Sequence, residues 1–251
     1  MDLTVFVFLA LFALVALGMW MATRSARRQR EQAQGQLAAD AAARGWTFES
    51  GTEGLFDLQR WSGQTDGHRW TAEYRRGRHR KGSARTRTHR LRWWTEGFGG
   101  SATPILLIGV PRGKELTAAP LTPGDGLLAS MAQKAAGFAL DQALDAHFGE
   151  ALGRQVDARD LRMVDGVELP GFIVMAADGA QARFWLEQAG HRQALLAQVG
   201  DAASAFSDEQ DRPWVLLLGR HLTLAQPVPV RRTDDLERLV RAGVALAEAF
   251  R

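Results

Sequence analysis

WTAEYRRGRHRKGSARTRTHRLRWW, residues 70–94, is the stretch that decides the fold. Apolar and polar side chains alternate in residues 70–75, and residues 86–94 alternate in the same way, with Leu91 and Trp93 on one face. A period of two is typical of a half-buried strand with one apolar face and one wet face. The stretch therefore predicts two strands joined by a basic segment, with Glu73 and Arg75 on the wet face.

Further strands are expected on both sides of this pair. Asp66-Gly67 is a favourable two-residue hairpin turn. The apolar run 104–110 is typical of a central strand. Later strands are expected at 161–164 and 171–176, and a strand pair at 214–218 and 222–224 turns at Gly219. We expect the first five strands to form an antiparallel meander: 46–48, 55–61, 70–75, 86–94 and 104–110.

Two long amphipathic helices complete the predicted fold. Apolar residues at helical spacing run from Leu127 to Phe148. The second helix begins at Thr233, a good N-cap, and two acidic residues follow in its first turn. A shorter helix over 180–187 is also expected, and it can merge with 192–198. The fold class is α+β, with an antiparallel sheet.

The N-terminal segment predicts a transmembrane anchor. Residues 3–22 carry no charge and are almost wholly apolar, and a helix of this length spans roughly 30 Å, the thickness of a bilayer core. Four arginines follow within residues 24–30. By the positive-inside rule the N-terminus then lies outside and the remainder is cytoplasmic. The alternative is a cleaved signal peptide, which would leave a secreted or periplasmic domain.

The predicted domain organisation follows from this anchor. Residues 1–22 form the anchor and residues 23–45 a helical stalk that ends at Gly45 as its C-cap. Residues 46–251 form the α+β domain, either as one unit or as the two halves 46–120 and 121–251. The protein is thus expected to be a single-pass, signal-anchored membrane protein.

Charge is strongly segregated along the chain. The formal net charge is +3, but residues 75–92 hold nine Lys or Arg and no acid, and residues 24–30 add four more basic residues. Outside these two segments, the chain contains 18 basic and 28 acidic residues. The chain is therefore an acidic protein that carries two basic segments.

The basic segment between the two strands is the candidate binding site, at the exposed tip of a long hairpin. An anionic lipid surface is the preferred ligand, because each cation near an anionic leaflet contributes about 1 kcal/mol and the anchor would hold the segment nearby. An acidic partner is the other candidate. Nucleic acid is disfavoured for two reasons. Trp93 lies on the same strand face as the apolar Leu91 and is therefore expected in the core, and no nucleic-acid-binding motif accompanies the patch. A solvated loop without function remains open. The candidate contact residues are Arg75, Arg76, Arg78, Arg80, Lys81, Arg85, Arg87 and Arg90.

No pattern in the sequence indicates a catalytic, cofactor or metal site. The chain has no cysteine, which excludes disulfides, thiol catalysis and thiolate metal sites. The six histidines do not have metal-ligand spacing. His147 is expected to have a structural role near a helix end, and His191 with Glu187 is expected to form a surface pair. An enzyme with an unrecognised site remains the alternative class.

Four segments carry a family resemblance: GWTF (45–48), PILLIGVPR (104–112), LPGFIVMAAD (169–178) and RPWVLL (212–217). In these the chain resembles a loosely defined family of bacterial membrane-anchored proteins of unknown function. The resemblance implies a sheet-rich cytoplasmic module behind a membrane span, and hence a bacterial inner-membrane location. It implies no catalytic residue.

The function expected from the sequence is that of a membrane-anchored binding or scaffold module. Its basic hairpin would contact anionic lipid or an acidic partner, and another membrane protein is a further candidate partner. Lipid bilayer, anionic headgroups and such a protein are the partners expected.

Overall fold

The computed structural model describes residues 3–54, 56–81, 84–97, 100–110, 127–149, 155–188, 190–199, 212–226 and 233–251. The chain divides into two compact units, Met1–Phe48 and Glu49–Arg251. Each unit is described separately below.

The first unit is built on one long helix, α1 (Leu3–Ala43). The helix ends where Gly45 adopts a φ of 72°, and the Trp46 amide donates to the Ala41 carbonyl at 2.9 Å. Glycine adopts this left-handed conformation without a Cβ penalty, which explains why the helix stops here. The helical continuation over 23–44 and the C-cap at Gly45 are confirmed.

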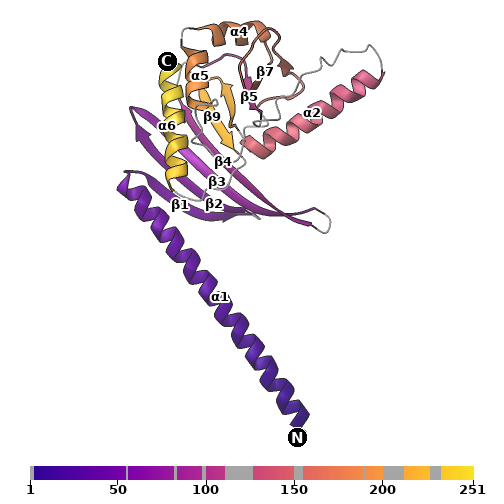
Figure 1. The fold of residues 1–251 in the computed structure, drawn as a ribbon, viewed down its shortest axis with the longest axis vertical. Helices are drawn as coiled ribbons and strands as arrows, with labels where there is room; N and C mark the ends of the chain where they lie inside the picture. Colours follow the sequence, from indigo (N-terminus) through magenta and orange to yellow (C-terminus); the bar gives the residue numbers. More distant parts are fainter. Residues whose placement is uncertain are drawn as a thin grey trace. The chain divides into compact units, whose positions relative to one another are not determined.

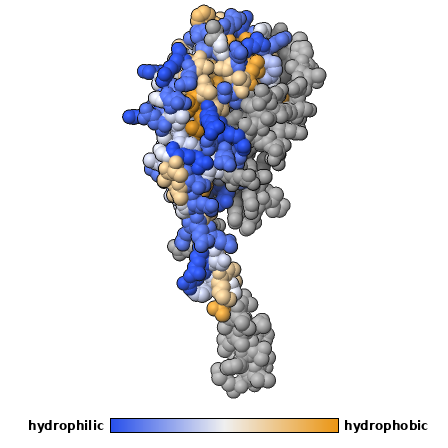
Figure 2. Space-filling model, turned by 60° about the vertical axis from the view of Figure 1, so that its left-hand side comes forward, coloured by the Kyte–Doolittle hydropathy of each residue, from blue (hydrophilic) through white to orange (hydrophobic). Residues whose placement is uncertain are grey.

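The predicted transmembrane anchor is wrong. Within the part of the chain that the structure describes, no helix is both long enough and apolar enough to cross a bilayer. Beyond the predicted span, the described side chains of α1 include exposed charges at Arg24, Arg28 and Glu31. Figure 2 shows a hydrophilic surface over most of the described length of this helix. The expectations that depended on the anchor are corrected with it: a single-pass signal anchor, an outside N-terminus and a bacterial inner-membrane location with a cytoplasmic domain.

The second unit contains a nine-stranded sheet in the order β1-β2-β3-β4-β9-β8-β5-β7-β6. Every pairing recorded from β2 to β9 is antiparallel, so the α+β class with an antiparallel sheet is confirmed. The strands are β1 (Thr47–Glu53), β2 (Phe56–Thr65), β3 (His68–Lys81), β4 (Ala84–Glu96), β5 (Ile105–Gly109), β6 (Arg162–Met163), β7 (Phe172–Ala176), β8 (Trp214–Leu218) and β9 (His221–Gln226).

The meander is shorter than the sequence predicts. It runs from β1 to β4, but β9 takes the place beside β4, and β5 pairs with β8 and β7. Strand β5 has the sequence ILLIG, and Ile105, Leu106 and Leu107 are fully buried. A strand that is apolar on both faces needs a neighbour on each edge and cover on each side. Its interior position, predicted from the apolar run, is confirmed, while its expected neighbour is wrong.

Both predicted turns are confirmed. Asp66 and Gly67 have φ values of 50° and 80° between β2 and β3, and Gly219 has a φ of 56° between β8 and β9. The first pair has the positive φ values that a type I′ hairpin turn requires. The segment 180–198 forms two helices rather than one, and Gly190 (φ 93°) lies just before the second.

The helices cover opposite faces of the sheet. They are α2 (Leu127–Phe148), α4 (Gly179–Glu187), α5 (His191–Val199) and α6 (Thr233–Ala249). Helix α6 packs on β3, β4 and β9 (Figure 1), where Gly243 lies against Trp93. Helix α2 buries Leu144 and Phe148 in a cluster with Leu216 and Ala225. Ala225 is paired with Arg92, so these two residues share a face of the sheet. Trp93 follows Arg92 in β4 and points to the other face, because successive side chains of a strand alternate. Helices α2 and α6 therefore lie on opposite faces. Both long helices are confirmed at their predicted positions, and α6 is amphipathic as predicted.

Candidate anion-binding hairpin

The hairpin of β3 and β4 extends beyond the rest of the sheet (Figure 1). Strand β2 pairs with β3 only as far as Gly77, and β9 pairs with β4 only from Leu91. The hairpin pairing itself continues to Lys81 and Ala84. Residues 78–81 and 84–87 therefore form a two-stranded projection with no further strand beside it among the described residues. We call this projection the basic arm.

The backbone register of the basic arm places like charges opposite each other. Arg78 is paired with Arg87, and Arg80 is paired with Arg85. Their side chains lie outside what the structure describes. Directly opposed residues of an antiparallel pair lie on one face with Cβ atoms about 4.5–5.5 Å apart, and like charges there are destabilising. The fold thus concentrates positive charge on two strands that nothing else in the sheet supports.

The structure places the backbone of the eight candidate residues at different levels along the hairpin. The basic segment forms strand rather than loop, and five of its cations belong to the basic arm: Arg78, Arg80, Lys81, Arg85 and Arg87. Arg76 lies nearer the body of the sheet and forms an exposed ion pair with Asp57 on β2 at 2.8 Å. Arg75 and Arg90 are paired with each other in the register and are only partly exposed, at the base of the hairpin.

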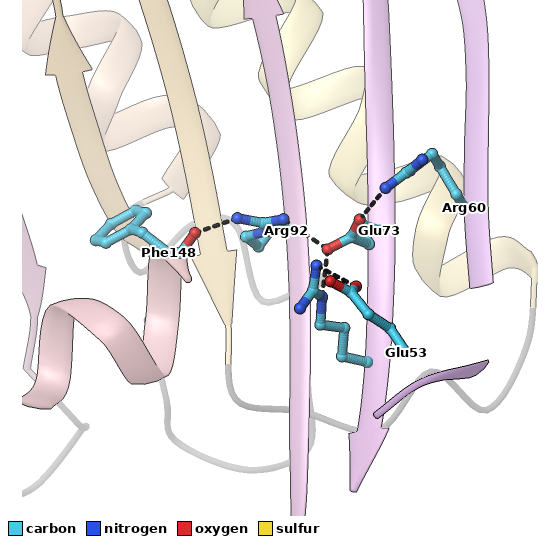
Figure 3. Close-up of polar contacts among 6 residues, drawn as sticks. Glu53, Arg60, Glu73, Arg92 and Phe148 are labelled. Carbon is cyan, nitrogen blue, oxygen red and sulfur yellow. Dashed lines mark hydrogen bonds and ion pairs between the residues drawn. The ribbon is translucent and has the colours of Figure 1, made fainter. Parts of the chain in front are cut away.

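At this base the side chain of Glu73 accepts hydrogen bonds from three guanidinium groups, as Figure 3 shows. Arg92 Nη2 and Arg75 Nε lie 2.5 and 2.7 Å from Glu73 Oε1, and Arg60 Nη2 lies 2.8 Å from Oε2. The Glu73 side chain is 1% exposed. The expectation that Glu73 lies on a wet face is therefore wrong. Its face is that of a strand interior to the sheet, where long arginine side chains from β2, β3 and β4 cover it.

The electrostatics of the Glu73 cluster follow from this packing. Burial alone would raise the pKa of Glu73, but the Arg92 charge and the hydrogen bonds from Arg60 and Arg75 outweigh it and lower the pKa to about 2. Glu73 is thus ionised at any physiological pH. The hydrogen bond to Glu73 raises the pKa of Arg60 in turn.

Arg92 connects this cluster to the end of helix α2. Its Nη1 donates to the Phe148 carbonyl, and its Cζ lies 5.1 Å from the centre of the Trp94 ring. The last carbonyls of a helix have no partner within the helix and carry the negative end of its dipole, so a guanidinium there is stabilising. The next residue, Gly149, has a φ of 84°. One arginine therefore neutralises Glu73 and caps α2.

Arg90 differs from its neighbours because it has no ion pair with any described residue. A Cβ on Gly149 would lie 3.0 Å from Arg90 Nη1 and 2.8 Å from Arg92 Nη1, so these two nitrogens are at most 5.8 Å apart. Burial and the charges of Arg92 and Arg75 lower the pKa of Arg90 to about 10. The guanidinium is still charged at neutral pH.

His147 and His191 both pack against aromatic rings. His147 Nδ1 lies 2.9 Å from the Ala143 carbonyl, and its ring stacks on Trp214 at 3.9 Å. The expected surface pair of His191 with Glu187 is wrong. His191 is buried, its Nδ1 lies 2.8 Å from the Trp185 carbonyl, and its ring packs against Trp185 and Phe250.

Sequence reasoning missed the Glu73 cluster. The sequence contains one clue to it. Glu73 is the one acidic residue of β3, and the register of the two hairpins pairs it with an arginine on each side, Arg60 and Arg92. Within the described part of the chain, no group of three or more His, Asp or Glu side chains is arranged to hold a metal ion. Comparisons with protein-family models, with curated proteins and with solved structures find no match to this chain.

Proposed function

We propose that the protein is a binding module that contacts an extended acidic polypeptide through the basic arm. The observation that supports this proposal is the register that pairs Arg78 with Arg87 and Arg80 with Arg85. A two-stranded hairpin is marginally stable on its own in water, and opposed like charges weaken it further. A ligand with negative charge removes this repulsion, so binding and ordering of the arm favour each other.

The spacing of the charges fits a polypeptide in extended conformation. The two arginine pairs are two residues apart along each strand, which is about 7 Å. Every second side chain of an extended peptide has the same spacing and points to the same side. Glutamate or aspartate at alternate positions would therefore meet successive arginine pairs. Guanidinium groups bind carboxylates through two parallel hydrogen bonds, which gives geometric specificity as well as charge attraction.

The two other polyanions are less well supported. Single-stranded nucleic acid is typically bound by aromatic rings on which its bases stack, but Trp93 is fully buried under α6 and Trp94 lies beneath Arg92. The argument for anionic lipid depended on a membrane tether, and no described helix spans a bilayer. Both polyanions serve as competitors in the test below.

The test measures binding of the full chain to a fluorescent peptide of alternating Glu and Ser. The arm variant replaces Arg78, Arg80, Arg85 and Arg87 with Gln. A control variant removes the same charge from four exposed arginines outside the arm: Arg69, Arg183, Arg192 and Arg220. A second peptide of the same composition, with its glutamates contiguous, tests the spacing.

We expect fluorescence anisotropy to report saturable binding to the alternating peptide that weakens as salt is added. The arm variant should lose at least about tenfold in affinity and the control variant should change little, because two or more charge-assisted hydrogen bonds are removed only in the first. An equal loss of affinity in both variants would mean that binding depends on the net charge of the protein and not on the basic arm, which would contradict the proposal. Tighter binding to a single-stranded oligonucleotide or to anionic vesicles would also contradict the proposal.

A further inference from the structure

Guanidinium groups outnumber the carboxylates that form ion pairs with them in the Glu73 cluster. Four guanidinium groups, those of Arg60, Arg75, Arg90 and Arg92, lie around two carboxylates, Glu73 and Glu53. Asp145 and Glu49 act on Arg90 and Arg60 from further away. Arg90 is the member of the group that forms no ion pair with a described residue, and Arg75 lies opposite it in the register.

Glu53 shows that an added oxyanion fits against this face. It reaches Arg75 Nη2 at 2.9 Å from the edge strand β1, and its side chain is 59% exposed (Figure 3). An exposed ion pair of this kind contributes little stability. Glu73, by contrast, is fully buried and held by three arginines. The cluster thus contains one permanent carboxylate and one that an external anion can displace.

We propose that Arg90, with Arg75 and Arg92 beside it, binds a dianionic phosphate group on this face of the sheet, in competition with Glu53. The Nη1 atoms of Arg90 and Arg92 are close enough to reach two oxygens of one tetrahedral anion at distances of about 2.7–2.9 Å. A dianion is attracted more strongly than a single carboxylate by the three neighbouring guanidinium groups. The inference goes beyond the proposed function, because it uses the base of the hairpin and not the basic arm.

The experiment titrates inorganic phosphate into the full chain by isothermal calorimetry, at a pH where phosphate is a dianion and at constant ionic strength. Acetate serves as the monoanionic comparison. Phenyl phosphate represents a phosphate ester, and comparison of its affinity with that of inorganic phosphate shows whether the site prefers the ester or the free ion. The variants are Arg90→Gln, Arg90→Lys and Glu53→Gln. Arg69→Gln is the control, since Arg69 is an exposed arginine of the same strand as Arg75.

We expect saturable phosphate binding that Arg90→Gln weakens by at least about tenfold, since one charged hydrogen-bonding group is removed. Arg90→Lys should give an intermediate affinity, because it keeps the charge but loses the planar fork. Glu53→Gln should strengthen binding and Arg69→Gln should leave it unchanged. Because Arg90 makes no bond to a described residue, and because burial and the charges of Arg92 and Arg75 disfavour its cation, Arg90→Gln should unfold at a temperature no lower than the parent.

Absence of saturable phosphate binding to the parent would overturn the proposal, as would equal affinity in Arg90→Gln or acetate binding as tight as phosphate binding. Unchanged affinity in Glu53→Gln would overturn the competition. The arm variant with Arg78, Arg80, Arg85 and Arg87 replaced should bind phosphate like the parent. Failure of this inference is thereby distinguishable from failure of the proposed function.

Discussion

The carboxylate of Glu73 lies 2.5 Å from the guanidinium of Arg92, directly across the β3–β4 pairing. Both side chains are largely removed from water, with exposures of 1% and 11%. Arg92 also donates to the Phe148 carbonyl at the end of α2. This single ion pair therefore joins the β2–β4 part of the sheet to the helix that covers β5, β8 and β9.

Substitution of Glu73 by Gln should strongly destabilise the protein. It leaves three buried or half-buried arginines without their shared counter-ion, and removal of one partner of a buried ion pair typically costs about 3–5 kcal/mol. Urea denaturation of the full chain measures the change. The matched control is Glu53→Gln, which removes an exposed pair and should cost no more than about 1 kcal/mol. Equal effects of the two variants would contradict the central role of Glu73.

The same carboxylate predicts how stability depends on acid pH. The folded state lowers the pKa of Glu73 from 4.5 to about 2. Its contribution is therefore fully present above pH 4.5 and is lost as the pH falls from 4.5 toward 2, because the unfolded chain takes up the proton first. The difference corresponds to about 3 kcal/mol. Denaturation midpoints of the parent and of Glu73→Gln should converge over this pH range, and parallel curves would refute the prediction.

Local patterns in the sequence were sufficient for much of the fold. The alternation of residues 70–75 and 86–94 predicts β3 and β4, and the helical spacing of apolar residues predicts α2 and α6. The turns at Asp66-Gly67 and Gly219 follow from residue type alone. Each of these features depends on neighbours within about ten residues, where periodicity is informative.

The features that sequence reasoning missed depend on distant parts of the chain. The pairing of β9 with β4 brings together Leu224 and Trp93, which no local pattern links. The alternation of its strand predicts a wet face for Glu73, but arginines from two other strands cover it. The apolar segment 3–22 predicted a membrane span that the described helices do not provide. The sequence thus predicts the candidate site as the exposed tip of a long hairpin, but it does not predict the separate buried cluster at the base of that hairpin.

Gly243 provides a test of the packing between α6 and the sheet. A Cβ at this position would lie 2.4 Å from Trp93 Cε3, and Trp93 is fully buried. Gly243→Ala should therefore destabilise the protein, since overpacking of a core costs about 1–3 kcal/mol while the gain in helix propensity is about 1 kcal/mol. Thermal and urea denaturation measure the change.

The matched control for Gly243 is Gly137→Ala in α2. Among the described residues, no atom outside the local helix lies within 4 Å of a Cβ at Gly137. The same substitution should stabilise here by up to about 1 kcal/mol, because alanine favours the helix. The two variants should therefore shift stability in opposite directions. A stabilising Gly243→Ala would mean that α6 does not approach Trp93 as closely as described.

His191 should make stability fall as the pH drops below 6.5. Burial lowers its pKa in the folded state, although the hydrogen bond to the Trp185 carbonyl partly opposes this. The unfolded chain then binds the proton first, so stability is lost from about pH 6.5 down to the pKa of the folded state and is constant below it. Burial also lowers the pKa of His68, which acts in the same direction. Because both histidines contribute, the part due to His191 is obtained as the difference in free energy of unfolding between the parent and His191→Phe at each pH. This variant should lose about 1 kcal/mol at high pH, where the hydrogen bond is removed, and should approach the parent as the pH falls. A constant difference across the range would show that His191 does not titrate with folding.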